Sequence, residues 1–151
     1  MKKKFLVFAF IVVGTLTVGT YAQRNVTPAI DRDPLIEADA KHNLDVAWQS
    51  FSLKKAYKGV LSRFEETYAA YPEFSKIDEF LYLAGMSSYY LSDNKGKQKV
   101  DLKMEKEKAK FAPAKLKEDA VAYLSLLVDK HPQSKYVDDA KKTLSLLKDE
   151  K

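Results

Sequence analysis

The chain has 151 residues, of which 46% are hydrophobic and 31% are charged, and this length is enough for one domain with a modest core. It contains no cysteine, which excludes disulfides, thiolate metal sites and cysteine nucleophiles. Three of its 26 basic residues lie at positions 2–4, and the 23 others against 21 acidic residues are too few to indicate a nucleic-acid partner.

Residues 1–22 have the pattern of a bacterial secretory signal peptide. Three lysines precede an unbroken apolar run over residues 5–13, and small residues at Thr20 and Ala22 suit a signal peptidase. We expect cleavage after Ala22 and export to the periplasm or the periphery of the outer membrane. An uncleaved membrane anchor is the alternative, but the apolar run is short for a span. Residues 23–33 are predicted to be a flexible leader.

The first two predicted helices follow the leader. Asp33 and Pro34 favour a helix start, because Asp is a preferred N-cap and Pro suits the first helical position. Apolar residues then recur at three- and four-residue steps as far as Phe51, and a second amphipathic pattern ends at Pro72. Residues 51–55 are predicted to be the joint between the two helices. No Gly or Pro marks this joint, so one long helix over residues 34–71 stays open as an alternative.

The third predicted helix is the most apolar one. Residues 77–91 are hydrophobic on nearly every side, which predicts a central, buried position. Ser75 is predicted to be its N-cap, with Asp78 three residues later as an approximate capping box. Gly85 lies among small residues, and we expect it to allow a close approach between neighbouring helices despite its low helix propensity.

A lysine-rich insertion over residues 95–112 follows. We predict either a solvated connection or a weak helix, and a connection of this length is typically mobile or functional. An alternative function uses it as an adaptor to an anionic membrane surface, to which it would bind weakly. The candidate residues for this anionic-surface patch are Lys97, Lys99, Lys103, Lys106, Lys108 and Lys110.

Two more helices are predicted after the insertion, one from Pro113 to the residues before Pro132 and one that Ser134 caps. The Tyr71-Pro72 and His131-Pro132 joints have the same design and lie 60 residues apart. Tetratricopeptide helix pairs repeat every ~34 residues, and the roughly 26 extra residues match the insertion in length. We therefore predict an all-α, five-helix, right-handed tetratricopeptide-like repeat over residues 34–149. It would hold about two and a half repeats, with the last helix covering the open end.

Residues around the two joints carry a family resemblance. They are Ala56-Tyr57, Arg63-Phe64-Glu65-Glu66, Tyr71-Pro72, residues 78–85, Ser88-Tyr89-Tyr90 and His131-Pro132-Gln133-Ser134. Over roughly residues 35–147 the chain resembles the tetratricopeptide-like domain of the outer-membrane assembly lipoprotein BamD and its relatives. The resemblance implies a periplasmic scaffold that helps to assemble outer-membrane β-barrels. That family normally carries a lipobox cysteine, which this chain lacks, so we expect a protein without a lipid anchor.

A groove along the first and third helices is the candidate binding site for a segment of an envelope protein, because helical repeats commonly bind partners there. Its candidate residues are Trp48, Tyr82, Met86, Tyr89 and Tyr90. The alternative is that these side chains belong to the core, with the tyrosine hydroxyls at its edge.

No motif typical of catalysis or of cofactor binding occurs in the sequence. The two histidines, His42 and His131, lie on different predicted elements, and a position at a helix end explains His131. We expect a non-catalytic protein without a metal or cofactor, and a small envelope hydrolase is the remaining alternative.

Overall fold

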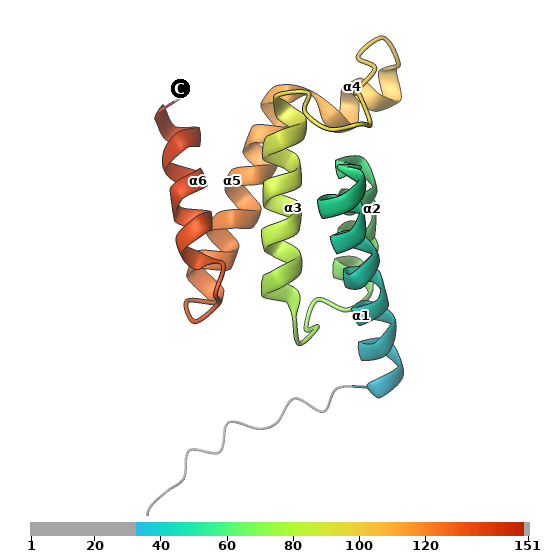
Figure 1. Cartoon of the computed structure of the whole chain (residues 1–151), viewed down its shortest axis with the longest axis vertical. Helices are drawn as coiled ribbons and strands as arrows, with labels where there is room; N and C mark the ends of the chain where they lie inside the picture. Colours follow the sequence, from blue (N-terminus) through green and yellow to red (C-terminus); the bar gives the residue numbers. More distant parts are fainter. Residues whose placement is uncertain (1–32, 150–151) are drawn as a thin grey trace, which may run out of the picture. The chain divides into compact units, whose positions relative to one another are not determined.

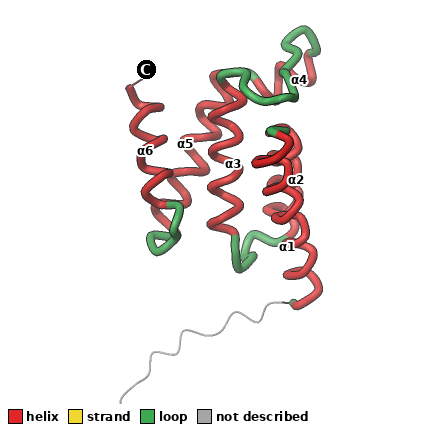
Figure 2. Tube along the Cα trace, in the orientation of Figure 1, coloured by secondary structure: helices red, strands yellow, loops and turns green. Residues whose placement is uncertain are grey.

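The computed structural model of the chain describes residues 33–149, and all regular structure in that range is helical (Figures 1 and 2). The predicted signal peptide and residues 23–32 of the leader lie outside the described residues. The elements are α1 (Pro34–Gln49), the π-helical turn η1 (Ser50–Lys54), α2 (Tyr57–Ala70), α3 (Ile77–Ser92), the short α4 (Glu105–Phe111), α5 (Pro113–Lys130) and α6 (Val137–Asp149). Five long helices side by side, with no strand among the described residues, confirm the predicted all-α, tetratricopeptide-like class.

Helices α1 and α2 are separate, which decides the alternative that the sequence left open. Asp33 caps α1 as predicted, since its Oδ1 accepts a hydrogen bond of 2.9 Å from the amide of Leu35. At the other end the helix widens into η1, and Lys55 adopts a left-handed conformation with φ of 48°. The amide of Ala56 then donates to the carbonyl of Ser50 at 2.8 Å, which closes the helix end without a Gly or Pro.

The two proline joints have the same backbone hydrogen bonds. The amide of Tyr71 donates to Thr67, and those of Phe74 and Ile77 each donate to the carbonyl three residues before. Residues 127–137 repeat this series of bonds at an offset of 60 residues, at 2.9, 2.9 and 3.2 Å. The internal repeat that the sequence indicated is therefore also a repeat of backbone geometry.

The predicted cap at Ser75 is wrong. Helix α3 begins only at Ile77, with Lys76 as its N-cap residue and no side-chain cap. Ser75 is instead oriented toward α1, where its amide donates to Glu37 Oε1 at 3.2 Å. The residue equivalent to Ser134 at an offset of 60 is Phe74, whose side chain is only 2% exposed. The first joint therefore uses this position for the core, where the second has a serine.

Helix α3 is central, as predicted. Eleven of its 16 residues are buried, more than in any other described helix, and it packs between α2 and α5 (Figure 1). Helix α1 packs on α2, and α6 packs on α5. This order gives two helix pairs, α1 with α2 and α3 with α5, and leaves α6 as the half-repeat.

Candidate functional site

Aromatic side chains from three repeats form a continuous row. Trp48 of α1 lies 6.2 Å from Tyr136, measured between ring centroids. Tyr136, the residue before α6, stacks on Tyr82 of α3 at 4.5 Å with the ring planes 15° apart. All three side chains are half-buried, so each presents part of its ring to solvent.

The row continues along the other end of α3. Phe51 lies 6.0 Å from Trp48 and 6.0 Å from Tyr90, which in turn lies 5.7 Å from Tyr89. These side chains are again half-buried. We call the whole set the aromatic row, and its members are Trp48, Phe51, Tyr82, Tyr89, Tyr90 and Tyr136.

Four of the five predicted groove residues meet at one shallow pocket of about 280 Å³, which the aromatic row borders. Its lining from α3 is Tyr82, Met86, Tyr89 and Tyr90, and its lining from α6 is Asp139, Lys142, Thr143 and Leu146. Trp48 does not line this pocket and joins it through Tyr136. The second wall is therefore α6, where the sequence-based prediction placed α1.

Phe51, Tyr136 and the α6 wall were not among the predicted groove residues. The 60-residue offset between the joints contains a signal for the wall, because it maps Tyr82 onto Lys142 and Met86 onto Leu146. All four side chains line the pocket. The same face of two successive repeats thus supplies both walls of the pocket. The apolar periodicity of a single helix does not identify which residues of another helix face it.

Polar groups fix the orientation of the rings. The indole Nε1 of Trp48 donates a hydrogen bond of 2.5 Å to Glu79 Oε1 on α3, which ties α1 to the pocket helix. Lys135 Nζ lies 4.9 Å from the centroid of the Tyr136 ring. Burial, and then the nearby Asp139 carboxylate, raise the pKa of Tyr82 to about 12. The Tyr82 hydroxyl is therefore a neutral hydrogen-bonding group at any physiological pH.

The lysine-rich insertion is docked on the start of α2. Lys58 Nζ donates to both carboxylate oxygens of Glu107 at 2.8 Å and to the carbonyl of Lys99 at 2.6 Å. The two side chains of the ion pair are only 17% and 25% exposed. Glu107 also accepts from the amide of Asp101 at 2.7 Å. The hydrogen bond from Lys58, and then that from Asp101, lower the pKa of Glu107.

The six lysines of the predicted anionic-surface patch are all exposed. Lys110 pairs with Glu65 of α2 at 2.5 Å, Lys108 lies 3.8 Å from Glu105, and the amine of Lys99 donates to the carbonyl of Asn94. Within the described residues, Lys97, Lys103 and Lys106 form no ion pair. Part of the patch's charge therefore has no counter-ion among residues 33–149.

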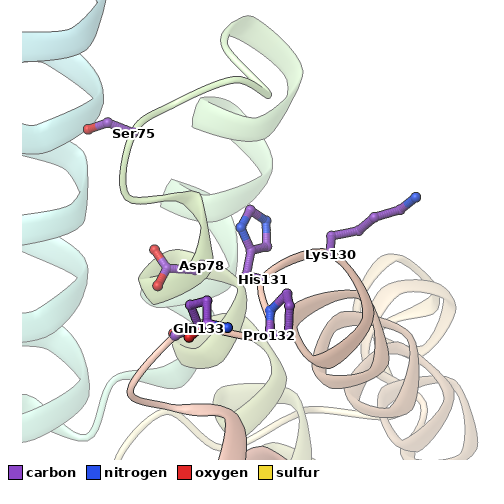
Figure 3. A pocket seen from close by; sticks show the side chains of 7 residues that line it. Ser75, Asp78, Lys130, His131, Pro132 and Gln133 are labelled. Carbon is purple, nitrogen blue, oxygen red and sulfur yellow. The ribbon is translucent and has the colours of Figure 1, made fainter. Parts of the chain in front are cut away.

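The two proline joints border a second pocket, of about 390 Å³ (Figure 3). It brings Ser75 and Asp78 of the first joint near His131 of the second. In Figure 3 the Ser75 side chain points away from the His131 ring, so the two do not form a nucleophile and base pair. Across the described residues, no cluster of three or more His, Asp or Glu side chains is arranged to hold a metal ion.

The helix pairs and the aromatic row define the class of protein: an all-α, tetratricopeptide-like repeat whose repeats share one aromatic surface. Comparison with protein families gives a match over residues 22–150 to YfiO, described as outer membrane lipoprotein. The chain therefore belongs to the YfiO family, and this confirms the resemblance to BamD and its relatives. Comparisons with curated proteins and with solved structures gave no match.

None of the helices in the described range combines the length and the apolar character needed to cross a membrane. The predicted cleavage after Ala22 and the expectation of no lipid anchor concern residues outside that range. Both stay predictions.

Proposed function

We propose that this protein is a non-catalytic scaffold of the bacterial envelope that binds a segment of a partner protein along the aromatic row. The observation that carries the proposal is the row itself. Six half-buried aromatic side chains, contributed by three repeats, form a continuous series of ring contacts. Three of them, Tyr82, Tyr89 and Tyr90, line an open pocket. A core has no need of so many partly exposed rings, whereas Tyr and Trp are enriched where proteins bind partners.

The geometry suits a peptide segment better than a small molecule. A volume of about 280 Å³ is below the usual range for ligand pockets, and it is open between two helices. It accommodates one or two side chains of a longer segment that continues over Tyr136 toward Trp48. Asp139 and Lys142 on the α6 wall offer one charge of each sign to the backbone or side chains of that segment.

Membership of the YfiO family supports a role at the outer membrane. We infer that the partner is a component of outer-membrane protein assembly and that the chain acts after export, in the periplasm or at the periphery of the outer membrane. The binding surface requires no metal or cofactor, because its contacts are aromatic stacking, apolar burial and hydrogen bonds.

Photo-crosslinking from single positions in intact cells tests this function. A photoreactive phenylalanine analogue at Tyr89 lies in the pocket, and one at Tyr68 is a matched control. Tyr68 is a partly exposed tyrosine of α2 that stacks on Phe64, outside the aromatic row. We expect crosslinks from position 89 to components of outer-membrane assembly, and few from position 68. The same products from both positions, or none from position 89, would contradict the proposal.

A further inference from the structure

The positive charge of the described chain is concentrated in the insertion. Residues 95–112 contain seven lysines against three acidic residues, whereas the other described residues contain 13 basic against 16 acidic residues. One of the three acids in the insertion, Glu107, is paired with Lys58 of α2. The helical repeat is thus slightly acidic, and the insertion is a separate cationic element.

This element is held in a defined place. Besides the Lys58 ion pair, the amide of Gly59 donates to Gln98 Oε1 at 3.2 Å, and the amide of Lys97 donates to the carbonyl of Lys55 at 3.0 Å. Gly96 packs so closely that a Cβ there would lie 2.6 Å from the Lys55 carbonyl oxygen. In Figure 1, α4 and its loop lie beyond the ends of α2 and α3. The insertion is therefore an ordered projection.

The projection presents apolar side chains beside its lysines. Leu102 is 46% exposed and Met104 is 54% exposed. A local turn holds them, because the amide of Met104 donates to the carbonyl of Asp101 at 3.1 Å and that of Lys103 donates to Asp101 Oδ1 at 2.9 Å. Lys103 lies between these two residues in the chain, and Lys106 follows Met104 by two residues; neither lysine has an ion-pair partner within the described residues.

Two exposed apolar side chains, close in the chain to lysines without an ion pair in the described range, fit a surface that is both anionic and apolar. Lipid headgroup phosphates attract the lysines, and the boundary with the acyl chains accommodates leucine and methionine. A soluble polyanion such as a nucleic acid offers only phosphates to this turn, and the turn lacks the interleaved aromatic rings that stack on bases.

We propose that the insertion docks on an anionic lipid surface. Lys103 and Lys106 contact the lipid phosphates, while Leu102 and Met104 enter the boundary between headgroups and acyl chains. Because the insertion is fixed on α2, this contact also holds the helical repeat in a set orientation at the membrane. The proposal goes beyond the binding of a protein partner and does not depend on it.

The test measures binding of the exported protein, purified from cells, to vesicles of phosphatidylcholine with and without phosphatidylglycerol. We expect salt-sensitive binding that requires the anionic lipid. Because each lysine at an anionic surface contributes on the order of fivefold in affinity, K103Q/K106Q weakens binding by roughly 25-fold. The matched control is K141Q/K148Q, which removes two exposed lysines of α6 and weakens binding by less than about threefold because these lysines are not at the docked surface. No binding by the unmodified protein, or equal losses in both pairs, would overturn the proposal.

A second pair of variants separates lipid from other polyanions. L102S/M104S keeps every charge, and we expect it to weaken binding to anionic vesicles several-fold while binding to heparin is unchanged. If this pair binds vesicles as tightly as the unmodified protein does, the apolar contact is absent. The insertion is then a general polyanion site, and the lipid proposal fails. Circular dichroism of each variant excludes misfolding as the cause of a loss.

Discussion

Substitution of Gly85 by alanine is the sharpest test of how α3 and α5 pack. A Cβ at Gly85 would lie 2.6 Å from both Cγ and Cδ2 of Leu124. Contacts this short are not tolerated between carbon atoms, so one side chain has to move. Leu124 is fully buried, and Cγ is the branch point of its side chain, so a rotation of the methyl groups alone does not relieve the clash.

Two effects of opposite sign set the magnitude. Alanine in place of glycine in a helix stabilises by about 1 kcal/mol, because it reduces the conformational entropy of the unfolded chain. Forcing an extra methyl group into a packed interface costs about 1–3 kcal/mol. Since the contact at Gly85 is far inside van der Waals distance, we take the upper part of that range and expect a net loss of about 1–2 kcal/mol for Gly85→Ala.

Gly59 supplies the matched control. It lies near the start of α2, and a Cβ there would meet only Ser50 Oγ, at 3.9 Å, which is ordinary contact. Gly59→Ala therefore has the higher helix propensity of alanine without a steric clash, and we expect it to stabilise the protein by up to about 1 kcal/mol. Urea unfolding followed by circular dichroism gives both free energies of unfolding. A Gly85→Ala protein at least as stable as the unmodified one would refute the close approach of α3 and α5.

Three further predictions follow from the joint, the insertion and the pocket. Phe74→Ala should destabilise the protein by about 3–5 kcal/mol in urea unfolding, because the ring is buried in the first joint, while Ser75→Ala should change little because Ser75 caps no helix. Glu107→Gln should release the insertion and speed its cleavage by trypsin. In the unmodified protein the same release should occur as pH falls through the lowered pKa of Glu107, since the carboxylate must be charged to hold Lys58. The free energy of unfolding should fall as pH rises from 10 toward 12. Tyr82 ionises at lower pH in the unfolded chain than in the folded protein, so high pH favours the unfolded chain. Urea unfolding of Tyr82→Phe at each pH should show a smaller decrease of the free energy of unfolding over this range.

The helices and their order were accessible from the sequence because they rest on local signals. Apolar periodicity, Pro72 and Pro132 determine where helices run and end, and the apolar run over residues 77–91 predicted the central helix. The break between α1 and α2 was predicted from the two apolar patterns, but the sequence did not exclude one long helix. The break depends on Lys55 in a left-handed conformation, which non-glycine residues adopt uncommonly and which no residue type there indicates.

Long-range contacts account for most of what the sequence did not predict. The insertion has the composition of a solvated connection, and its docking rests on the Lys58–Glu107 pair, whose partners lie 49 residues apart. The position of Tyr136 beside Tyr82 likewise depends on how α5 returns α6 to the face of α3. Charged and aromatic residues occur both in solvated and in paired settings, so composition alone does not distinguish the two.

The side chains on the two faces of α6 explain why the pocket beside the aromatic row stays exposed to solvent. Helix α6 packs on α5 and buries Val137, Ala140, Thr143 and Leu147. A groove between α5 and α6 is lined mainly by polar residue types: Ser125, Asp129, Lys141, Ser145 and Lys148, with Val128 and Leu144. A repeat helix that packs on a following helix needs an apolar face there, whereas terminal repeats present polar side chains to water. On the pocket side, however, Leu146 is 45% exposed beside Met86. Helix α6 thus covers the core and presents a solvated outer face, but it leaves an apolar side chain at the pocket. This arrangement is expected of a half-repeat that also forms one wall of a binding surface.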